Sequence, residues 1–417
     1  MNKPKNNPPT QKEHRMSKWQ NIRLGDIADF SNGINFDKSS YCENGTYLIG
    51  VSDFGEELFP DYSTLRHIDS TIVRECNLLK DGDIVFVRSN GNKALVGRSM
   101  LIKNPPENTS FSGFCIRARI KNHESFDPLF FAYLFKSENF RKAIAGCSIG
   151  ANIQNLSQGK LASYMAYVPS IEIQRKIADV LSAYDDLIEN NRKQIKLLEE
   201  AAQRLYKEWF IDLRFPGHET TPIIDGIPEG WEKKKLENIC PIVTGKRDAN
   251  FGSPDGEYLF FTCSQEPIKS ATYSFDTSAV ILAGNGDFNV KLYRGKFEAY
   301  QRTYVLSPQS AESLFLLFGA VRTNMRELTQ KASGSTIKFL TRGMIADIEI
   351  FIPNDSLLIQ YNVLSNDIQK KMEYLVNSIK YATEARDRLL PKLITGELQE
   401  TRNRLLKKLI NNTSKEI

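Results

Sequence analysis

Two stretches of the chain carry apolar residues at steps that alternate between four and three positions. The first, residues 171–210, contains no proline or glycine and is rich in helix formers. Such steps predict a helix with a coiled-coil heptad seam, about 60 Å long at roughly 1.5 Å per residue. Its seam positions are Ile177, Leu181, Tyr184, Ile188, Asn191, Ile195, Leu198, Ala202, Leu205 and Trp209.

The same pattern returns 184 residues later, and eight of its ten positions are apolar or aromatic. Because a lone helix with such a seam would expose an apolar stripe, we expect the two helices to form an intramolecular coiled coil. The polar members Asn191, Ser365 and Arg386 would fix its register. The second seam comprises Tyr361, Ser365, Ile368, Met372, Leu375, Ile379, Ala382, Arg386, Leu389 and Leu393.

The direction of the two helices is open at this point. Two identical domain-plus-helix units related by a two-fold axis would pair their helices antiparallel. A parallel pairing remains compatible with the sequence. Separate docking of two amphipathic helices on two globules is a further alternative, which the length of both seams disfavours.

The segments before the two helices form an internal repeat. Residues 19–33 and 231–245 share Trp, Leu, Ile and Gly at an offset of 212, which falls to 184 further along, so the first copy carries extra loop residues. Alternating apolar runs predict a mixed α/β globule in each copy. We expect strands at 46–51, 83–88, 114–120, 257–262, 279–283 and 302–306, and helices at 128–145 and 311–331.

These patterns give a domain plan of two globules and two long helices. The expected segments are a disordered tail at 1–16, a first globular domain at 17–170, a long helix at 171–212, a linker with a second globular domain at 213–354, a second long helix at 355–397, and a basic tail at 398–417. Phe210 and Phe215 lie off the seam. We expect them where helix and domain meet, with a partner subunit at the same junction as a hypothesis.

Composition narrows the class of protein. The 417 residues are 41% hydrophobic and 25% charged, as in soluble globular proteins, and no apolar run reaches the ~18 residues of a membrane span. The N-terminus has no apolar segment of the secretory type. The chain has six cysteines without a Cys-x-x-Cys pair and four scattered histidines, so we predict no zinc site. The same pattern favours free thiols in a reducing cytoplasm.

Basic segments occur at matching places in the two copies. Residues 84–121 hold seven Lys/Arg against the single acid Glu107, a local excess suited to DNA phosphates, and Arg and Asn suit base edges. The steps Asn-Gly at 90–91 and 285–286 align the two segments; the alternative is a hairpin turn with a solvated basic face. The candidate DNA-binding residues are Arg88, Asn90, Lys93, Arg98, Asn285, Lys291, Arg294, Lys296 and Arg302.

Catalytic motifs point away from an enzyme. "NPPT" at 7–10 and "NPPE" at 104–107 lack the aromatic residue that stacks on a flipped adenine, and no glycine-rich loop for a methyl donor precedes them. A P-loop is absent from the sequence, so we expect no ATP hydrolysis by this chain.

Three segments resemble the conserved regions of one family, the specificity subunits of type I restriction-modification enzymes. They are "VPSIEIQRKIADVLSAYDDLIENNRKQIKLLEEAAQRLYKEWFIDLRFPG" at 168–217, "GIPEGWEKKKLENI" at 226–239 and "RLLPKLITGEL" at 388–398. The resemblance covers nearly the whole chain from Trp19 to Leu398.

The resemblance implies an α/β chain with two target-recognition domains in pseudo-two-fold repeat, separated by an antiparallel coiled coil that acts as a spacer. Each domain would read one half of a split site in double-stranded DNA. Two modification subunits and two restriction subunits would assemble around this non-catalytic chain. S-adenosylmethionine, ATP and magnesium would bind those partners, and no cofactor would bind this chain. The alternatives are a specificity module of a different methyltransferase-nuclease arrangement and a coiled-coil protein scaffold without base reading.

Overall fold

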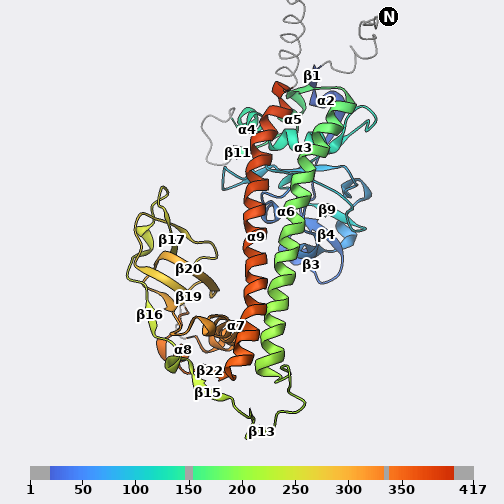
Figure 1. Cartoon of the computed structure of the whole chain (residues 1–417). Helices are drawn as coiled ribbons and strands as arrows, with labels where there is room; N and C mark the ends of the chain where they lie inside the picture. Colours follow the sequence, from blue (N-terminus) through green and yellow to red (C-terminus); the bar gives the residue numbers. More distant parts are fainter. Residues whose placement is uncertain (1–18, 146–153, 333–337, 399–417) are drawn as a thin grey trace, which may run out of the picture. The chain divides into compact units, whose positions relative to one another are not determined.

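The computed structural model describes residues 19–145, 154–332 and 338–398, in two compact units (Figure 1). One unit holds the chain up to Asn190 together with the part from Ile379 onward, and the other runs from Asn191 to Ser378. The tail expected at 1–16, and all but the first residue of the tail expected at 398–417, lie outside the described residues.

The first domain is a stack of two sheets and a helical layer. Its main sheet has the antiparallel order β2-β10-β6-β8 (Ala28–Asn32, Cys115–Ile120, Ile84–Val87, Ser99–Leu101). Along β6, Ile84 and Phe86 face α3 (Pro128–Lys136), α4 (Glu138–Ala145) and α5 (Gln158–Ser163), whereas Val85 and Val87 face the second sheet. That sheet has the order β3-β5-β4-β9 (Tyr41–Cys42, Arg66–Ile68, Thr46–Ile49, Thr109–Phe111).

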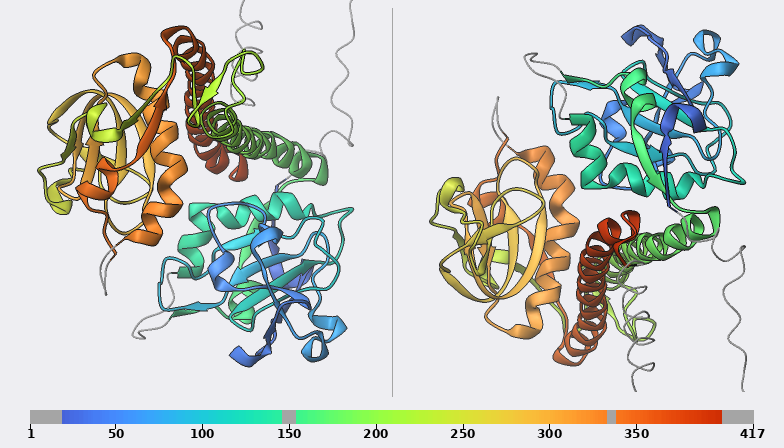
Figure 2. Two further views of the ribbon diagram at one scale, coloured as in Figure 1. Left: turned by 90° about the horizontal axis from the view of Figure 1, so that it is seen from below. Right: turned by 90° about the horizontal axis from the view of Figure 1, so that it is seen from above.

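The second domain is built around one six-stranded sheet. Its order is β16-β21-β19-β20-β17-β18 (Ile242–Thr244, Thr303–Leu306, Phe275–Ala283, Val290–Ala299, Tyr258–Phe261, Ile268–Ser270). The helix α7 (Leu314–Lys331) packs on one face through Val280 and Leu282, and a smaller core around Ile281 and Phe297 lies on the other (Figure 2).

The repeat is visible in how each domain is closed. In the first, β1 (Gln20–Arg23) pairs antiparallel with β12 (Met165–Val168), just before the long helix. In the second, β15 (Glu232–Lys235) pairs in the same way with β22 (Glu349–Ile352). The pairs Gln20–Val168 and Glu232–Ile352 therefore occupy equivalent positions, and the predicted pseudo-symmetric α/β repeat is confirmed.

Two elements differ from the sequence prediction. No strand was predicted between 283 and 302, but Val290–Ala299 is the long strand β20, which pairs with β19 across the turn at Asn285-Gly286, in line with the hairpin alternative. Gly295 and exposed cations interrupt the apolar alternation that marks a strand. The helix expected at 128–145 is two helices, because the Ser137 hydroxyl donates to the carbonyl of Leu134 and accepts from the amide of Phe140, which starts a new helix.

The long helices pair antiparallel in both units. They are α6 (Ile171–Tyr206), continued by a π-helical turn over Lys207–Ile211, and α9 (Asp355–Ile394). In the first unit Asp185 bonds Arg386, and in the second Asn191 bonds Ser378 at 2.9 Å. Further along α6, Trp209 lies 5.8 Å from the ring of Tyr361.

Residues further along α6 thus contact residues nearer the start of α9. The antiparallel coiled coil is therefore confirmed, and the parallel pairing and the separate docking of the two helices are wrong. All residues of both expected seams are buried or half-buried. The polar seam residue Asn191 donates its amide to the Ser378 hydroxyl, which satisfies a buried group inside the seam.

Phe210 and Phe215 lie where the long helix meets the second domain, as expected. Both are buried in the second domain, where each packs against Trp231 at ring distances of 5.6 and 4.6 Å. The π-helical turn rotates Phe210 toward the domain core, so a residue off the heptad seam is fully buried. The expected junction of helix and domain is therefore confirmed, and a partner subunit at the same junction stays a hypothesis.

Replacing Phe210 by Ala is expected to lower the free energy of unfolding by about 3–5 kcal/mol, because it leaves a cavity in this core. The control is Ile211→Ala at the adjacent side chain, 50% exposed, with an expected effect within about 0.5 kcal/mol. Denaturant unfolding followed by tryptophan fluorescence reports on this core through Trp209 and Trp231. Equal effects of the two substitutions would contradict the packing.

Candidate nucleic-acid interface

Arg88 follows β6 and ties three segments of the first domain together. Its amide donates to the carbonyl of Phe114 at 2.8 Å, and its guanidinium Nη1 donates to the carbonyl of Gly113 at 3.2 Å. Its own carbonyl accepts from the amide of Leu156 at 2.8 Å. The half-buried Arg88 therefore stabilises the arrangement of these loops and also carries a positive charge.

Asn90 and Lys93 lie on the loop that follows. The strand β7 (Ser89–Asn90) pairs with β11 (Gln154–Asn155), and the Asn90 side-chain oxygen accepts from the amide of Asn92 at 2.7 Å. This side-chain bond fixes the turn that presents the exposed Lys93.

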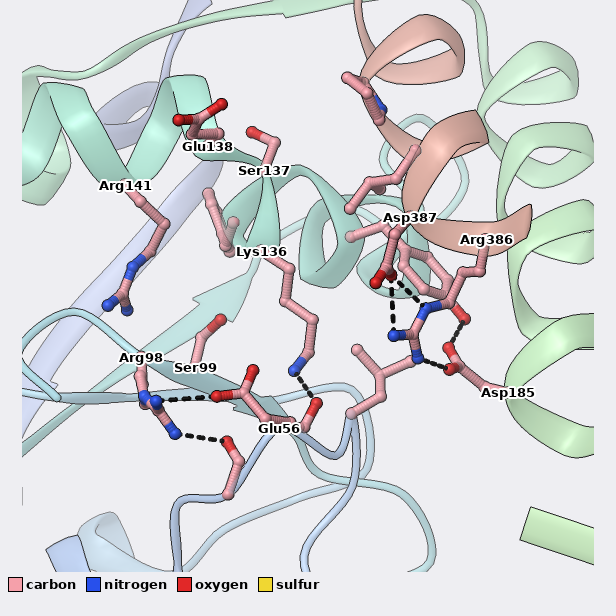
Figure 3. Close-up of a pocket in the computed structure, with 16 residues that line it drawn as sticks. Glu56, Arg98, Ser99, Lys136, Ser137, Glu138, Arg141, Asp185, Arg386 and Asp387 are labelled. Atoms are coloured by element: carbon pink, nitrogen blue, oxygen red, sulfur yellow. Dashed lines mark hydrogen bonds and ion pairs between the residues drawn. The ribbon is translucent and has the colours of Figure 1, made fainter. Parts of the chain in front are cut away.

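Arg98, the fourth candidate in this segment, lies in a different place. It bonds Glu56 at 2.8 Å and the carbonyl of Gly55, inside a cavity of about 520 Å³ (Figure 3). The cavity also contains Lys136, whose ammonium donates to the carbonyls of Glu56 and Glu57, and burial lowers the pKa of Lys136 to about 8.

The far wall of this cavity is a link between the first domain and the long helices. Asp185 on α6 accepts from the Tyr133 hydroxyl and from the Arg386 guanidinium on α9, each at 2.5 Å (Figure 3). Burial, with Asp185 alongside, raises the pKa of Tyr133. Arg98 lines the same cavity, and its guanidinium is already bonded to Glu56 and to the carbonyl of Gly55.

A groove of about 830 Å³ opens beside the Arg88 segment. Arg66 stacks on Tyr41 at 4.3 Å along it, and Phe114 projects with 62% of its side chain exposed. Asn35 and Lys38 complete its polar lining. No local pattern in the sequence points to these residues, because strand pairing brings them together from distant segments.

In the second domain, Asn285, Lys291 and Arg302 gather around one turn. The Arg302 carbonyl accepts from the amide of Gly284 at 2.9 Å, and the Lys291 amine donates to the carbonyl of Ser264 at 2.9 Å. Asn285 forms an antiparallel bridge with Phe339. Partial burial lowers the pKa of Lys291, whereas Arg302 is exposed.

Arg294 and Lys296 lie apart from that turn. Arg294 stacks on Phe315 of α7 at 5.0 Å and bonds Asn366 of α9 at 3.1 Å. The ammonium of Lys296 lies 4.9 Å from the ring centre of Tyr273. Of the five candidates in this domain, the structure brings together Asn285, Lys291 and Arg302 near the turn, whereas Arg294 and Lys296 lie further along β20.

The two domains use the same hydrogen bonds to assemble their loops. Three backbone hydrogen bonds recur in both: one is donated by a glycine amide, one is accepted by the carbonyl at the end of a strand, and one is donated by a leucine amide. The pairs, donor first, are Gly33–Cys115 and Gly245–Thr303, Ser112–Ile49 and Tyr300–Phe261, and Leu156–Arg88 and Leu340–Gly284.

We call the assembled segments the first loop cluster (33–35, 50–52, 88–93, 112–114 and 154–156) and the second loop cluster (245–247, 262–264, 284–289, 300–302 and 338–340). In this register Asn285 corresponds to Ser89, which pairs with Asn155 as Asn285 pairs with Phe339. The two Asn-Gly steps are therefore one residue out of alignment.

Both loop clusters require glycine at the same place. A Cβ on Gly33 would lie 2.2 Å from the carbonyl oxygen of Phe111, and a Cβ on Gly245 would lie 2.0 Å from that of Ala299. The repeated glycine noted in the sequence thus allows two backbone segments to touch.

The second loop cluster is positively charged at its surface. Lys246, Arg302 and Lys338 are exposed, and Asp287 is the exposed acid within the same segments. Such an excess suits phosphate oxygens, and the neighbouring amide side chains suit base edges. The part of the chain that the structure describes brings together no group of three or more metal-binding side chains. None of its helices is long and apolar enough to cross a membrane.

Comparison with known proteins gives a consistent result. The family model described as "Type I restriction modification DNA specificity domain" matches residues 16–200 and 228–379. The type I restriction enzyme EcoDI specificity subunit of Escherichia coli is 38% identical over 168 residues, which cover 40% of this chain and 36% of that protein. The MjaIX specificity subunit of Methanocaldococcus jannaschii is 27% identical over 369 residues, which cover 80% of this chain and 82% of that protein.

The fold is also found among solved structures. The S subunit of a type I restriction-modification system from M. genitalium matches with a TM-score of 0.58 at 15% sequence identity, covering 90% of this chain and 96% of that one. At this identity the match shows a shared fold.

Substituting Gly33 by Ala is expected to lower the free energy of unfolding by about 1–3 kcal/mol, because the backbone of β9 must move away from the new methyl group. The matched control is Gly91→Ala in the same loop cluster, where nothing lies within 4 Å of the added carbon. Thermal unfolding of both variants, with amide exchange at Phe111 to Cys115, measures the difference. Similar stability of the two variants would contradict the close contact.

Proposed function

The chain belongs to the family of type I restriction modification DNA specificity domains, and from that premise we propose that it is the DNA-recognition subunit of a type I restriction-modification complex. The chain is non-catalytic by itself. The observation that carries the proposal is the presence of two equivalent loop clusters, one in each domain, assembled by the same backbone hydrogen bonds.

Each loop cluster combines the two kinds of group that reading duplex DNA requires. Flexible exposed cations such as Lys93 and Arg302 suit the phosphates, which set affinity and position. Fixed polar side chains such as Asn90 suit base edges in the major groove. A coiled-coil scaffold without base reading would need neither.

The two domains share one fold but carry different residues at equivalent positions. Such a pair suits a DNA target whose two half-sites differ in sequence. Arg302, for example, stands where the first domain has Phe114, since both accept from the residue that follows the central strand. The antiparallel helices would act as the spacer that sets the gap between the half-sites.

Partner subunits supply the chemistry in this proposal. Two modification subunits would carry adenine methylation with S-adenosylmethionine, and two restriction subunits would carry ATP- and magnesium-dependent cleavage, in the cytoplasm. Exposed apolar side chains on the helices, among them Leu197, Tyr374 and Tyr381, support a docking role because partners would cover them.

Sequencing of methylated bases in cells that carry this chain with its modification subunit tests the proposal. We expect one motif of two short specific half-sites separated by a fixed gap without base preference. A continuous motif, or no methylation that depends on this chain, would contradict it.

The contribution of the exposed cations is tested with the double variant Lys93→Glu/Arg302→Glu. It should lower DNA affinity and flatten its salt dependence, because about two phosphate contacts are lost. The control is Lys142→Glu/Lys331→Glu, which changes the same charge at exposed lysines paired with Glu138 and Glu327 on helices. Equal losses in the two double variants would argue against the loop clusters as the DNA surface.

A further inference from the structure

A carboxylate is completely buried beneath the second loop cluster. Glu298, near the end of β20, has 0% of its surface exposed. It accepts from the Ser274 hydroxyl at 2.8 Å, from the amide of Ala299 at 3.1 Å and from Nε of Arg247 at 3.3 Å. Because a buried charge is costly without a partner, Glu298 holds the Arg247 side chain strongly at this position.

Arg247 is fixed from two further directions. Its guanidinium carbon lies 4.3 Å from the ring centre of Phe251, so the plane of the group stacks on an aromatic face. Its backbone carbonyl accepts from the amide of Gln301 at 2.9 Å, and the residue forms a parallel bridge with Tyr300. Both the start and the end of this side chain are therefore held.

These contacts leave the outer edge of the guanidinium available. The side chain is 40% exposed, and Nη1 and Nη2 make no hydrogen bond to any residue in the described part of the chain. Because Glu298 engages Nε, the two terminal nitrogens of this partly exposed group keep their donors for a ligand. An arginine fork held in this way loses little conformational entropy when it binds.

We propose that Arg247 reads a guanine in the half-site bound by the second domain. The paired acceptors O6 and N7 of guanine in the major groove match a guanidinium fork, and this is the commonest specific contact between a side chain and a base. The inference rests on the proposed DNA-reading function and adds the base class and the residue. Glu298 and Phe251 act as positioning residues, since they would touch Arg247 and not the DNA.

The first domain has no such group at the equivalent position. Ile34 forms the parallel bridge with Ser112 that Arg247 forms with Tyr300, and it accepts from Gly113 as Arg247 accepts from Gln301. Ile34 is buried and has no side-chain donor. The guanine contact therefore belongs to one half-site only.

Other cations of the second domain differ in ways that provide controls. Arg302 is exposed in the same loop cluster and forms no ion pair with a carboxylate in the described part of the chain, which suits a phosphate contact. Arg294 is committed to Phe315 and Asn366 on helices. The three arginines permit the same Arg→Lys change in three settings.

The test uses the complex of this chain with its modification subunit and sequences the methylated motif for Arg247→Lys, Arg302→Lys and Arg294→Lys. At position 247 a lysine keeps the positive charge and can pair with Glu298, but it lacks the two terminal nitrogens of the guanidinium that would bind O6 and N7 of guanine. For Arg247→Lys we expect preference for guanine over other bases to fall roughly 5- to 150-fold at one position of one half-site. Arg302→Lys should weaken methylation evenly across sequences, and Arg294→Lys should leave the motif unchanged.

A second variant, Phe251→Leu, removes the stacking surface but keeps the ion pair, and should relax the same position to a smaller degree. A role of the Arg247–Glu298 pair in stability alone would lower the unfolding temperature without altering any base preference, and that result would overturn the inference. An unchanged motif in Arg247→Lys, or an even loss over both half-sites, would overturn it as well. Absence of a two-part motif for the unaltered chain would instead contradict the proposed function.

Discussion

The rest of the structure depends on the apolar seam between α6 and α9. Each compact unit completes its core with both helices: Leu181 and Ile394 lie in the core of the first domain, and Trp209 and Tyr361 lie in that of the second. The antiparallel direction makes this possible, since each unit receives the start of one helix and the end of the other. Hydrophobic burial along the seam therefore contributes to the core of each unit by itself.

Within each domain, the sheets bring together loops that are distant in the sequence. Glycine at 33 and 245 lets two backbones touch, and the amides of Leu156 and Leu340 close each cluster from the far side. The positive charge is divided between exposed cations at the surface and an arginine that is bonded to a buried carboxylate. That division corresponds to the two tasks of DNA recognition, positioning on phosphates and discrimination between bases.

Periodicity predicted the helices, their register and the repeat, because heptad spacing and the recurring tryptophan and glycine are local features of the sequence. The site was predicted in part. Arg88, Lys93 and Arg302 lie in the loop clusters, whereas Arg98 and Arg294 are engaged elsewhere, and a count of charges cannot tell these cases apart. Arg66, Phe114 and Arg247 were missed because tertiary pairing alone gives them their surroundings. Phe210 was expected off the seam at the junction of helix and domain, and it lies there, whereas the π-helical turn that carries it has no signal in the heptad pattern.

The central claim is that the helix pair acts as a ruler between two reading domains. The direct measurement is the methylated motif after insertion of one heptad into both α6 and α9 at facing positions. Seven residues add about 10.5 Å at 1.5 Å each, so the gap should grow by about three base pairs at roughly 3.4 Å each, with both half-sites unchanged. A constant gap, or altered half-site sequences, would contradict the claim.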